Sequence, residues 1–168
     1  MGARAADDDS AGASVTEFVS DDGRVRLVQG DCLVWRDWTS ADVLVTDPPF
    51  GTDNWGGYGR RQLGLETIEG DGDTTARDAV LALWGVRAAA VFASPRAPEP
   101  PGGWEWRLVW DKGRPGLGSP WRWSHEMIYV RGGWGNAPGI PSVLRHSAPL
   151  AMREAHHPHE KPVALIAE

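Results

Sequence analysis

The chain has 168 residues, of which 41% are hydrophobic and 24% are charged, within the range of one compact globular domain. Its single cysteine, Cys32, excludes an internal disulfide. Neither end carries a signal-peptide pattern or an apolar run long enough to cross a membrane. We therefore expect a cytoplasmic protein with no membrane partner.

The net charge of −6 argues against nucleic acid as a partner, because phosphate binding needs clustered lysine and arginine. The charge is uneven, however. Residues 1–86 hold 7 basic and 16 acidic side chains, whereas residues 87–168 hold 10 and 7, together with all five histidines. This basic second half is suited to a polyanion, but ordinary surface charge explains the same pattern equally well.

The first half of the chain predicts a disordered segment followed by two strands. Residues 1–20 are rich in Ala, Asp, Ser and Gly with little periodicity, so we expect a disordered acidic segment ahead of a domain at 21–168. The alternation in "RVRLVQGD", residues 24–31, predicts a strand that runs into a turn. The apolar run in "DVLVTD", residues 42–47, predicts the second strand.

The rest of the chain predicts two helices and three strands. In chain order they are a helix at 74–85, strands at 88–95, 104–113 and 125–134, and a helix at 161–168. Thr74 suits the N-cap of the first helix and Gly85 its end, while Pro162 suits the first turn of the second. This order predicts an α/β fold whose sheet has an antiparallel portion late in the chain.

The second predicted strand ends in Asp47-Pro48-Pro49-Phe50, a sequence that cannot continue a strand. In open α/β sheets ligands bind beyond the carboxyl ends of the strands, where this tetrapeptide lies. Both prolines fix φ and lack an N–H, and Pro48 restricts Asp47 to an extended conformation. The loop should therefore be stiff and present two acceptors, the Asp47 carboxylate and the Pro48 carbonyl.

A double acceptor suits an amino group with two N–H bonds. The exocyclic amine of a nucleobase is a poor nucleophile because its lone pair is delocalised into the ring, and two acceptors would draw it towards tetrahedral geometry. Phe50 offers a flat face for base stacking, worth roughly 1–3 kcal/mol in nucleic-acid complexes. The alternative is an ordinary rigid turn, since Asp and Pro are common turn residues.

The tetrapeptide resembles the catalytic motif of amino-group DNA methyltransferases, Asp/Asn/Ser-Pro-Pro-Tyr/Phe, which acts on adenine N6 or cytosine N4 of a flipped base. Other segments resemble parts of the same family in the same order: "VRLVQGDCL", "IEGD", "VFAS", "LVWDKG", "HEMIYV" and "HPHEKPVALIAE". The resemblance covers about residues 24–168. It implies a Rossmann-like sheet, S-adenosylmethionine as cofactor and DNA as partner, with the catalytic residues Asp47, Pro48, Pro49 and Phe50.

The resemblance also implies roles for residues outside the tetrapeptide. Together with Asp47, the cofactor would contact Asp31, Cys32, His157, Lys161 and Pro162. No covalent intermediate is needed in this family, so Cys32 is not expected to be catalytic. His125 and Glu126 resemble a family segment near the target-base pocket, and a structural role in the sheet is the alternative.

Three residues are candidates for contact with DNA. Trp55 lies in a glycine-rich loop and could stack on a base, while Lys112 and Arg114 could contact phosphate or could simply be surface residues. No metal site is expected, because the spacing of the C-terminal histidines fits no established ligand pattern.

One departure from the family pattern concerns the Phe-x-Gly-x-Gly cofactor loop, which does not occur in the chain. In the resembling class this loop follows the segment similar to "HPHEKPVALIAE". We therefore expect an incomplete sheet in which the strand at 43–45 has an unpaired edge. Three explanations are open: the chain is a fragment of a longer protein, a second chain or a homodimer completes the sheet, or the fold is degenerate and inactive. The acid in the tetrapeptide favours adenine N6. Two alternatives remain: cytosine N4 as the target, and a truncated, non-catalytic nucleic-acid-binding relic.

Overall fold

The computed structural model describes residues 16–51, 70–115, 120–133, 139–147 and 160–167. The chain divides into two compact units, Met1–Ala41 and Asp42–Glu168. The predicted domain boundary at residue 20 therefore falls inside the first unit. The residues of the tetrapeptide belong to the second unit.

The first unit is built on a hairpin. Strand β1 (Thr16–Val19) pairs antiparallel with β2 (Arg26–Gln29), and a 3-10 helix, η1 (Asp37–Ser40), follows. Residues 16–19 lie within the segment expected to be disordered. They form a strand because Phe18 faces Leu27 across the pair and the Arg26 guanidinium binds both oxygens of Glu17, at 2.7 and 3.1 Å.

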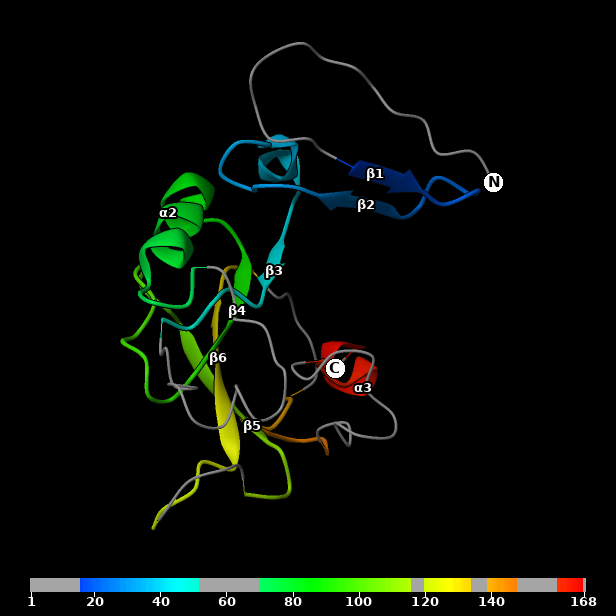
Figure 1. Ribbon diagram of the computed structural model, residues 1–168. Helices are drawn as coiled ribbons and strands as arrows, with labels where there is room; N and C mark the ends of the chain where they lie inside the picture. Colours follow the sequence, from blue (N-terminus) through cyan, green and yellow to red (C-terminus); the bar gives the residue numbers. More distant parts are fainter. Residues whose placement is uncertain (1–15, 52–69, 116–119, 134–138, 148–159, 168) are drawn as a thin grey trace, which may run out of the picture. The chain divides into compact units, whose positions relative to one another are not determined.

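The second unit contains a five-stranded mixed sheet in the order β3-β4-β6-β5-β7 (Figure 1). Its strands are β3 (Leu44–Thr46), β4 (Ala89–Ala93), β5 (Trp106–Asp111), β6 (His125–Arg131) and β7 (Val143–Arg145). β3 runs parallel to β4, and β7 runs parallel to β5, whereas β6 is antiparallel to both of its neighbours. The architecture is therefore mixed α/β with few helices.

The sheet confirms the predicted α/β class and the antiparallel portion late in the chain. β3 ends the strand order of the described sheet, which agrees with the expected edge position of this strand. The predicted strand at 24–31 forms β2 at Arg26–Gln29, and its partner is β1 of the first unit. β7 was not predicted, because its three residues are too few for a period to be visible and its strand conformation depends on pairing with β5.

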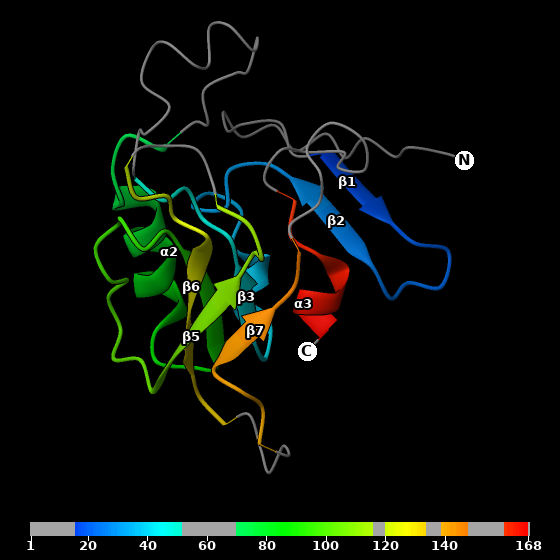
Figure 2. The same cartoon turned by 90° about the horizontal axis from the view of Figure 1, so that it is seen from below.

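Two helices lie on opposite faces of this sheet, α2 (Thr75–Trp84) on one and α3 (Val163–Ala167) on the other, as Figures 1 and 2 show. Gly85 ends α2 with a φ of 74°, as predicted. Thr74 is at the N-cap, but its hydroxyl donates to Asp78 instead of capping the backbone. The Asp73 carboxylate accepts from the Thr75 N–H at 2.8 Å.

The core between α3 and the sheet takes one side chain from each of four strands and one from α3. Strand alternation places the four strand residues on the same face of the sheet. The five residues, each at most 5% exposed, are Phe92, Trp110, Ile128, Leu144 and Leu165. Phe50 of the tetrapeptide packs against this cluster. The same packing that holds α3 on the sheet therefore positions the loop after β3.

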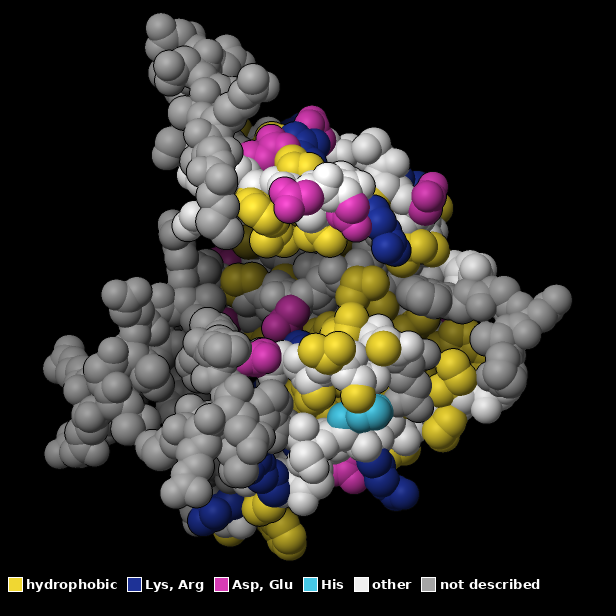
Figure 3. Space-filling model, turned by 90° about the vertical axis from the view of Figure 1, so that its right-hand side faces the viewer, with side chains coloured by type: hydrophobic (Ala, Val, Ile, Leu, Met, Phe, Trp, Pro, Cys, Tyr) yellow, Lys and Arg dark blue, Asp and Glu magenta, His cyan; other side chains and the backbone are white. Residues whose placement is uncertain are grey.

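The face that carries α3 also exposes apolar side chains (Figure 3). Val163 and Ile166 of α3 are 81% and 51% exposed, and Val143 of β7 is 41% exposed. Across the described ranges, no helix is long and apolar enough to cross a membrane.

Candidate active site

The tetrapeptide directly follows β3. The position of the loop that it begins is held by contacts of the next residue, Gly51. Gly51 adopts a φ of +67°, a conformation that side chains rarely allow, and its N–H donates to the Asp71 carboxylate at 3.0 Å. An added Cβ would lie 2.5 Å from the Asp73 carbonyl carbon. The loop is therefore pressed against the segment that leads into α2, which limits where Phe50 can lie.

We expect Gly51→Ala to destabilise the second unit by about 2–4 kcal/mol, because left-handed strain adds to a backbone clash that flexible side chains cannot relieve. Gly113→Ala is the matched control: its φ is +69°, but its added Cβ would meet only the Ser147 hydroxyl, at 3.8 Å. That variant should lose only about 1 kcal/mol. Urea unfolding measures both, and equal losses would contradict the close approach at Gly51.

An ion pair joins the tetrapeptide to the last helix. Lys161 Nζ lies 2.7 Å from Asp47 Oδ2, although the two residues are 114 positions apart in sequence. The Lys161 side chain is only 11% exposed, whereas that of Asp47 is 35% exposed. Leu165, buried in the core, holds α3 in place, and Lys161 lies two residues before the first residue of that helix. Two of the predicted site residues are therefore brought into contact.

Glu126 extends this ion pair into a chain of alternating charges. Its Oε2 lies 3.3 Å from Lys161 Nζ, and its Oε1 accepts a hydrogen bond from Lys112 Nζ at 2.6 Å. The sheet register explains the position, because Glu126 of β6 faces Trp110 of β5, and Lys112 directly follows β5. Two ammonium groups and two carboxylates thus alternate in a mostly buried row.

Aromatic rings surround the Lys161 ammonium. Its Nζ lies 5.7, 5.4 and 5.8 Å from the ring centroids of Phe50, Phe92 and Trp110. Lys112 Nζ lies 4.9 Å from the Trp110 ring. Rings at this range attract a cation through their quadrupole, so the site is suited to hold positive charge.

The row and its rings can do two things chemically. The Asp47 carboxylate can accept a hydrogen bond from an amino group, and Phe50 offers a ring beside it. The three rings and the two carboxylates already hold the Lys161 ammonium, and Lys161 could in turn pair with the carboxylate of a ligand such as S-adenosylmethionine. The arrangement therefore fits an amine at Asp47 and a carboxylate at Lys161.

Comparison with known proteins finds no matching family model and no matching curated protein. The methyltransferase reading therefore depends on the residues themselves.

Glu126, Phe92 and Trp110 are cluster residues that were not predicted as site residues. The resemblance had placed Glu126 near the target base, with a structural role as the alternative. Its position next to Lys161 depends on the pairing of β6 with β5, which the sequence does not reveal. In the sequence, Phe92 and Trp110 have the pattern of ordinary core residues, and both are buried in the structure.

Other predicted residues have different surroundings. Lys112, expected to contact phosphate, donates to Glu126, and Arg114 is exposed. Pro162 is half-buried, and its carbonyl accepts from Leu165 N–H at 3.0 Å. Trp55 and His157 lie outside the described residues. Within the described ranges, no group of three or more potential metal ligands occurs.

Asp31 and Cys32 belong to the first unit and are both exposed. The Asp31 carboxylate accepts from the Leu33 N–H at 2.8 Å, and its carbonyl accepts from the N–H groups of Val34 and Trp35. The Cys32 carbonyl accepts from the Trp38 indole at 2.8 Å. Both residues thus stabilise a local turn, and a contact with the cofactor stays a prediction.

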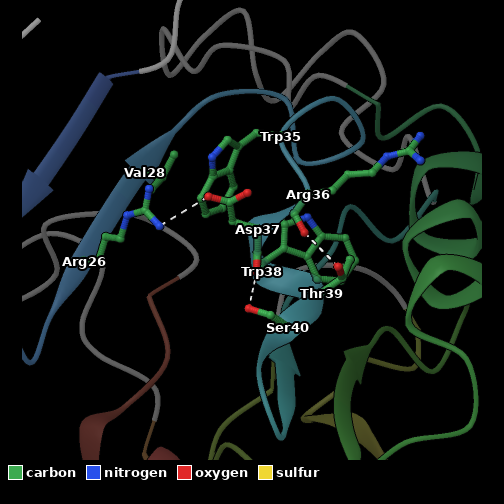
Figure 4. A pocket seen from close by; sticks show the side chains of 8 residues that line it. All are labelled: Arg26, Val28, Trp35, Arg36, Asp37, Trp38, Thr39 and Ser40. Carbon is green, nitrogen blue, oxygen red and sulfur yellow. Dashed lines mark hydrogen bonds and ion pairs between the residues drawn. The ribbon is translucent and has the colours of Figure 1, made fainter. Parts of the chain in front are cut away.

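A shallow pocket opens beside this turn (Figure 4). Arg26 lies 5.1 Å from the Trp35 ring centroid and 3.5 Å from the Asp37 carboxylate. The Thr39 and Ser40 hydroxyls donate to backbone carbonyls of the same segment. The polar side chains of the pocket are therefore largely engaged in holding η1.

Partial desolvation raises the pKa of the Cys32 thiol, and the Asp31 carboxylate raises it further. Because the thiolate is the reactive form, we expect iodoacetamide to modify Cys32 more slowly than a free thiol at neutral pH. The rate should continue to rise above pH 9. Asp31→Asn should lower the pKa and speed the reaction, as followed by mass spectrometry. A neutral-pH rate equal to that of free cysteine would contradict this assignment.

Proposed function

We propose that this chain carries the catalytic part of a Rossmann-like, S-adenosylmethionine-dependent DNA methyltransferase that acts on an exocyclic amino group, adenine N6 in preference to cytosine N4. One observation carries the proposal: the Asp47 carboxylate, just before the two prolines, contacts Lys161 of the segment "HPHEKPVALIAE", and the Lys161 ammonium lies beside the Phe50 and Phe92 rings. The two most specific segments of the sequence thus meet at one place.

In this proposal the tetrapeptide prepares the amine of a base flipped out of the duplex. The Asp47 carboxylate and the Pro48 carbonyl accept its two N–H bonds, which favours a tetrahedral nitrogen with an available lone pair. Phe50 stacks on the base. The loop fixes the positions of these groups before the substrate arrives.

When bound, S-adenosylmethionine supplies a methyl group whose bond to sulfur breaks as the bond to the amine nitrogen forms. The methylated nitrogen must then lose one proton, and the Asp47 carboxylate is the acceptor in place to receive it. Lys161 and Glu126 keep the surrounding charge balanced. No covalent bond between enzyme and base is required.

A second candidate is a non-catalytic nucleic-acid-binding domain. Its support is that Lys161 already neutralises Asp47 at 2.7 Å, an arrangement that also serves as a purely structural ion pair. This candidate predicts DNA binding without cofactor binding.

The proposal is tested by incubating the chain with tritiated S-adenosylmethionine and duplex DNA and then analysing the nucleosides. The expected product is N6-methyldeoxyadenosine, and N4-methyldeoxycytidine would revise the target base. Calorimetry of S-adenosylmethionine binding accompanies the assay. DNA binding with neither cofactor binding nor methyl transfer would refute the methyltransferase and support the second candidate.

A further inference from the structure

Lys161 is shared unequally between two carboxylates. Its Nζ donates a hydrogen bond to Asp47 Oδ2 at 2.7 Å, while Glu126 Oε2 lies at 3.3 Å, an ion-pair distance without hydrogen-bond geometry. A movement of the ammonium by a fraction of an ångström towards Glu126 would bring that oxygen to the same distance that Asp47 now has. The lysine therefore has two possible partners within reach.

Glu126 is prepared to receive the ammonium. Its Oε2 is buried and accepts no hydrogen bond from the part of the chain that the structure describes. Its Oε1 is held by Lys112 at 2.6 Å, which keeps the carboxylate in place. A buried acceptor without a donor is unfavourable, so the exchange would satisfy an oxygen that lacks a donor now.

The aromatic surroundings allow the exchange. Three rings lie 5.4–5.8 Å from Lys161 Nζ, so no one of them anchors the ammonium at a single point. Their attraction for a cation persists over a short displacement. The row of two lysines and two carboxylates keeps the same total charge in both arrangements.

We propose that Lys161 is a counter-ion switch, which holds Asp47 in the absence of substrate and transfers to Glu126 when an amino group binds to Asp47. The inference rests on the proposed function, because it takes the amine of a base as the competing donor. Lys161 and Glu126 are then positioning residues: they set when the Asp47 carboxylate is available, and neither touches the reacting atoms.

The switch can be tested without any ligand, because the chain has only two lysines, Lys112 and Lys161. In protein labelled with 13Cε-lysine, the Lys112→Arg variant identifies the Lys161 signal. Asp47→Asn removes the charge of the first partner. We expect the Lys161 signal to move to a second position distinct from that of free lysine, and acetylation of Lys161, followed by mass spectrometry, to stay within about twofold of the parent rate.

The double variant Asp47→Asn/Glu126→Gln should then expose Lys161 and raise its acetylation rate at least about tenfold. If Asp47→Asn alone gives the free-lysine signal and fast acetylation, Glu126 does not receive the ammonium and the switch is wrong. Because the Asp47 side chain is partly exposed, this single variant should fold. It therefore decides the question even if the double variant does not fold.

Single-stranded DNA probes test the trigger. An oligonucleotide with one adenine should move the Lys161 signal of the parent chain to the position seen in Asp47→Asn, whereas one with purine, which lacks the amino group, should not. Equal shifts with both probes would overturn the switch. If neither probe binds and duplex DNA receives no methyl group, the proposed function fails, and the ligand-free comparison still decides whether Lys161 can transfer.

Discussion

Asp47→Ala should lower methyl transfer by at least about 10²-fold while leaving the fold intact. The variant removes the acceptor that aligns the amine, and preorganised groups of this kind are typically worth that much. The loss of stability should be small, at most about 1 kcal/mol, because the ion pair with Lys161 is partly exposed on the Asp47 side. Tritium transfer and thermal unfolding measure the two effects.

Asp42→Ala provides the matched control, since Asp42 is an exposed carboxylate just before β3. It should retain activity within about twofold of the parent chain, as surface substitutions usually have small effects. If Asp47→Ala turned over at the parent rate, the mechanism built on the tetrapeptide would be wrong. If it failed to fold, the ion pair would have a structural role that the exposure of Asp47 does not suggest.

Arg131→Met should destabilise the second unit by about 3–5 kcal/mol, the largest loss of stability we expect from one substitution. Arg131 is 3% exposed, and its guanidinium donates to the carbonyls of Arg87, Gly102 and Gly85. Methionine fills similar space but donates no hydrogen bond, so three backbone carbonyls lose their donor. Each lost hydrogen bond should cost about 1 kcal/mol or more of stability. Gly85 also ends α2, where positive charge is favourable.

Burial lowers the pKa of Arg131, but a guanidinium remains protonated in proteins, so the charge is present in the native state. Arg131→Lys should recover only part of the loss, because an ammonium cannot reproduce the planar fork. Arg107→Met is the control: Arg107 forms a solvent-exposed pair with Glu99 at 2.7 Å, and exposed pairs of this kind add little to stability. Urea unfolding followed by tryptophan fluorescence measures the stability of both variants. Equal losses in the free energy of unfolding for Arg131→Met and Arg107→Met would contradict the structural role of the Arg131 hydrogen bonds.

The sequence was sufficient to predict features that are determined by residues a few positions apart. The helix that ends at Gly85 follows from its apolar spacing and the conformational freedom of glycine. β3 ends at Thr46, just before the two prolines, which lack the N–H that a strand needs. In each case the physical cause lies within a few residues of the feature, so the sequence alone is sufficient.

Features that depend on pairing between distant strands could not be predicted in the same way. Glu126 reaches Lys161 only because β6 aligns with β5 in one register, and a shift by one residue would turn it to the opposite face. β2 has the alternation of a sheet strand, but its partner is β1, not β3. Periodicity identifies a strand without identifying its neighbour.

The separation of Asp47 and Lys161 by 114 positions has a consequence for how the site forms. Bringing two ends of a flexible segment of that length together costs about 4 kcal/mol of chain entropy, which one partly exposed ion pair does not offset. Formation of the sheet and docking of Leu165 must therefore precede closure of the site. α3 has only one buried residue, Leu165, so we expect its detachment to cost less than unfolding of the sheet, and this opening would separate the two halves of the site.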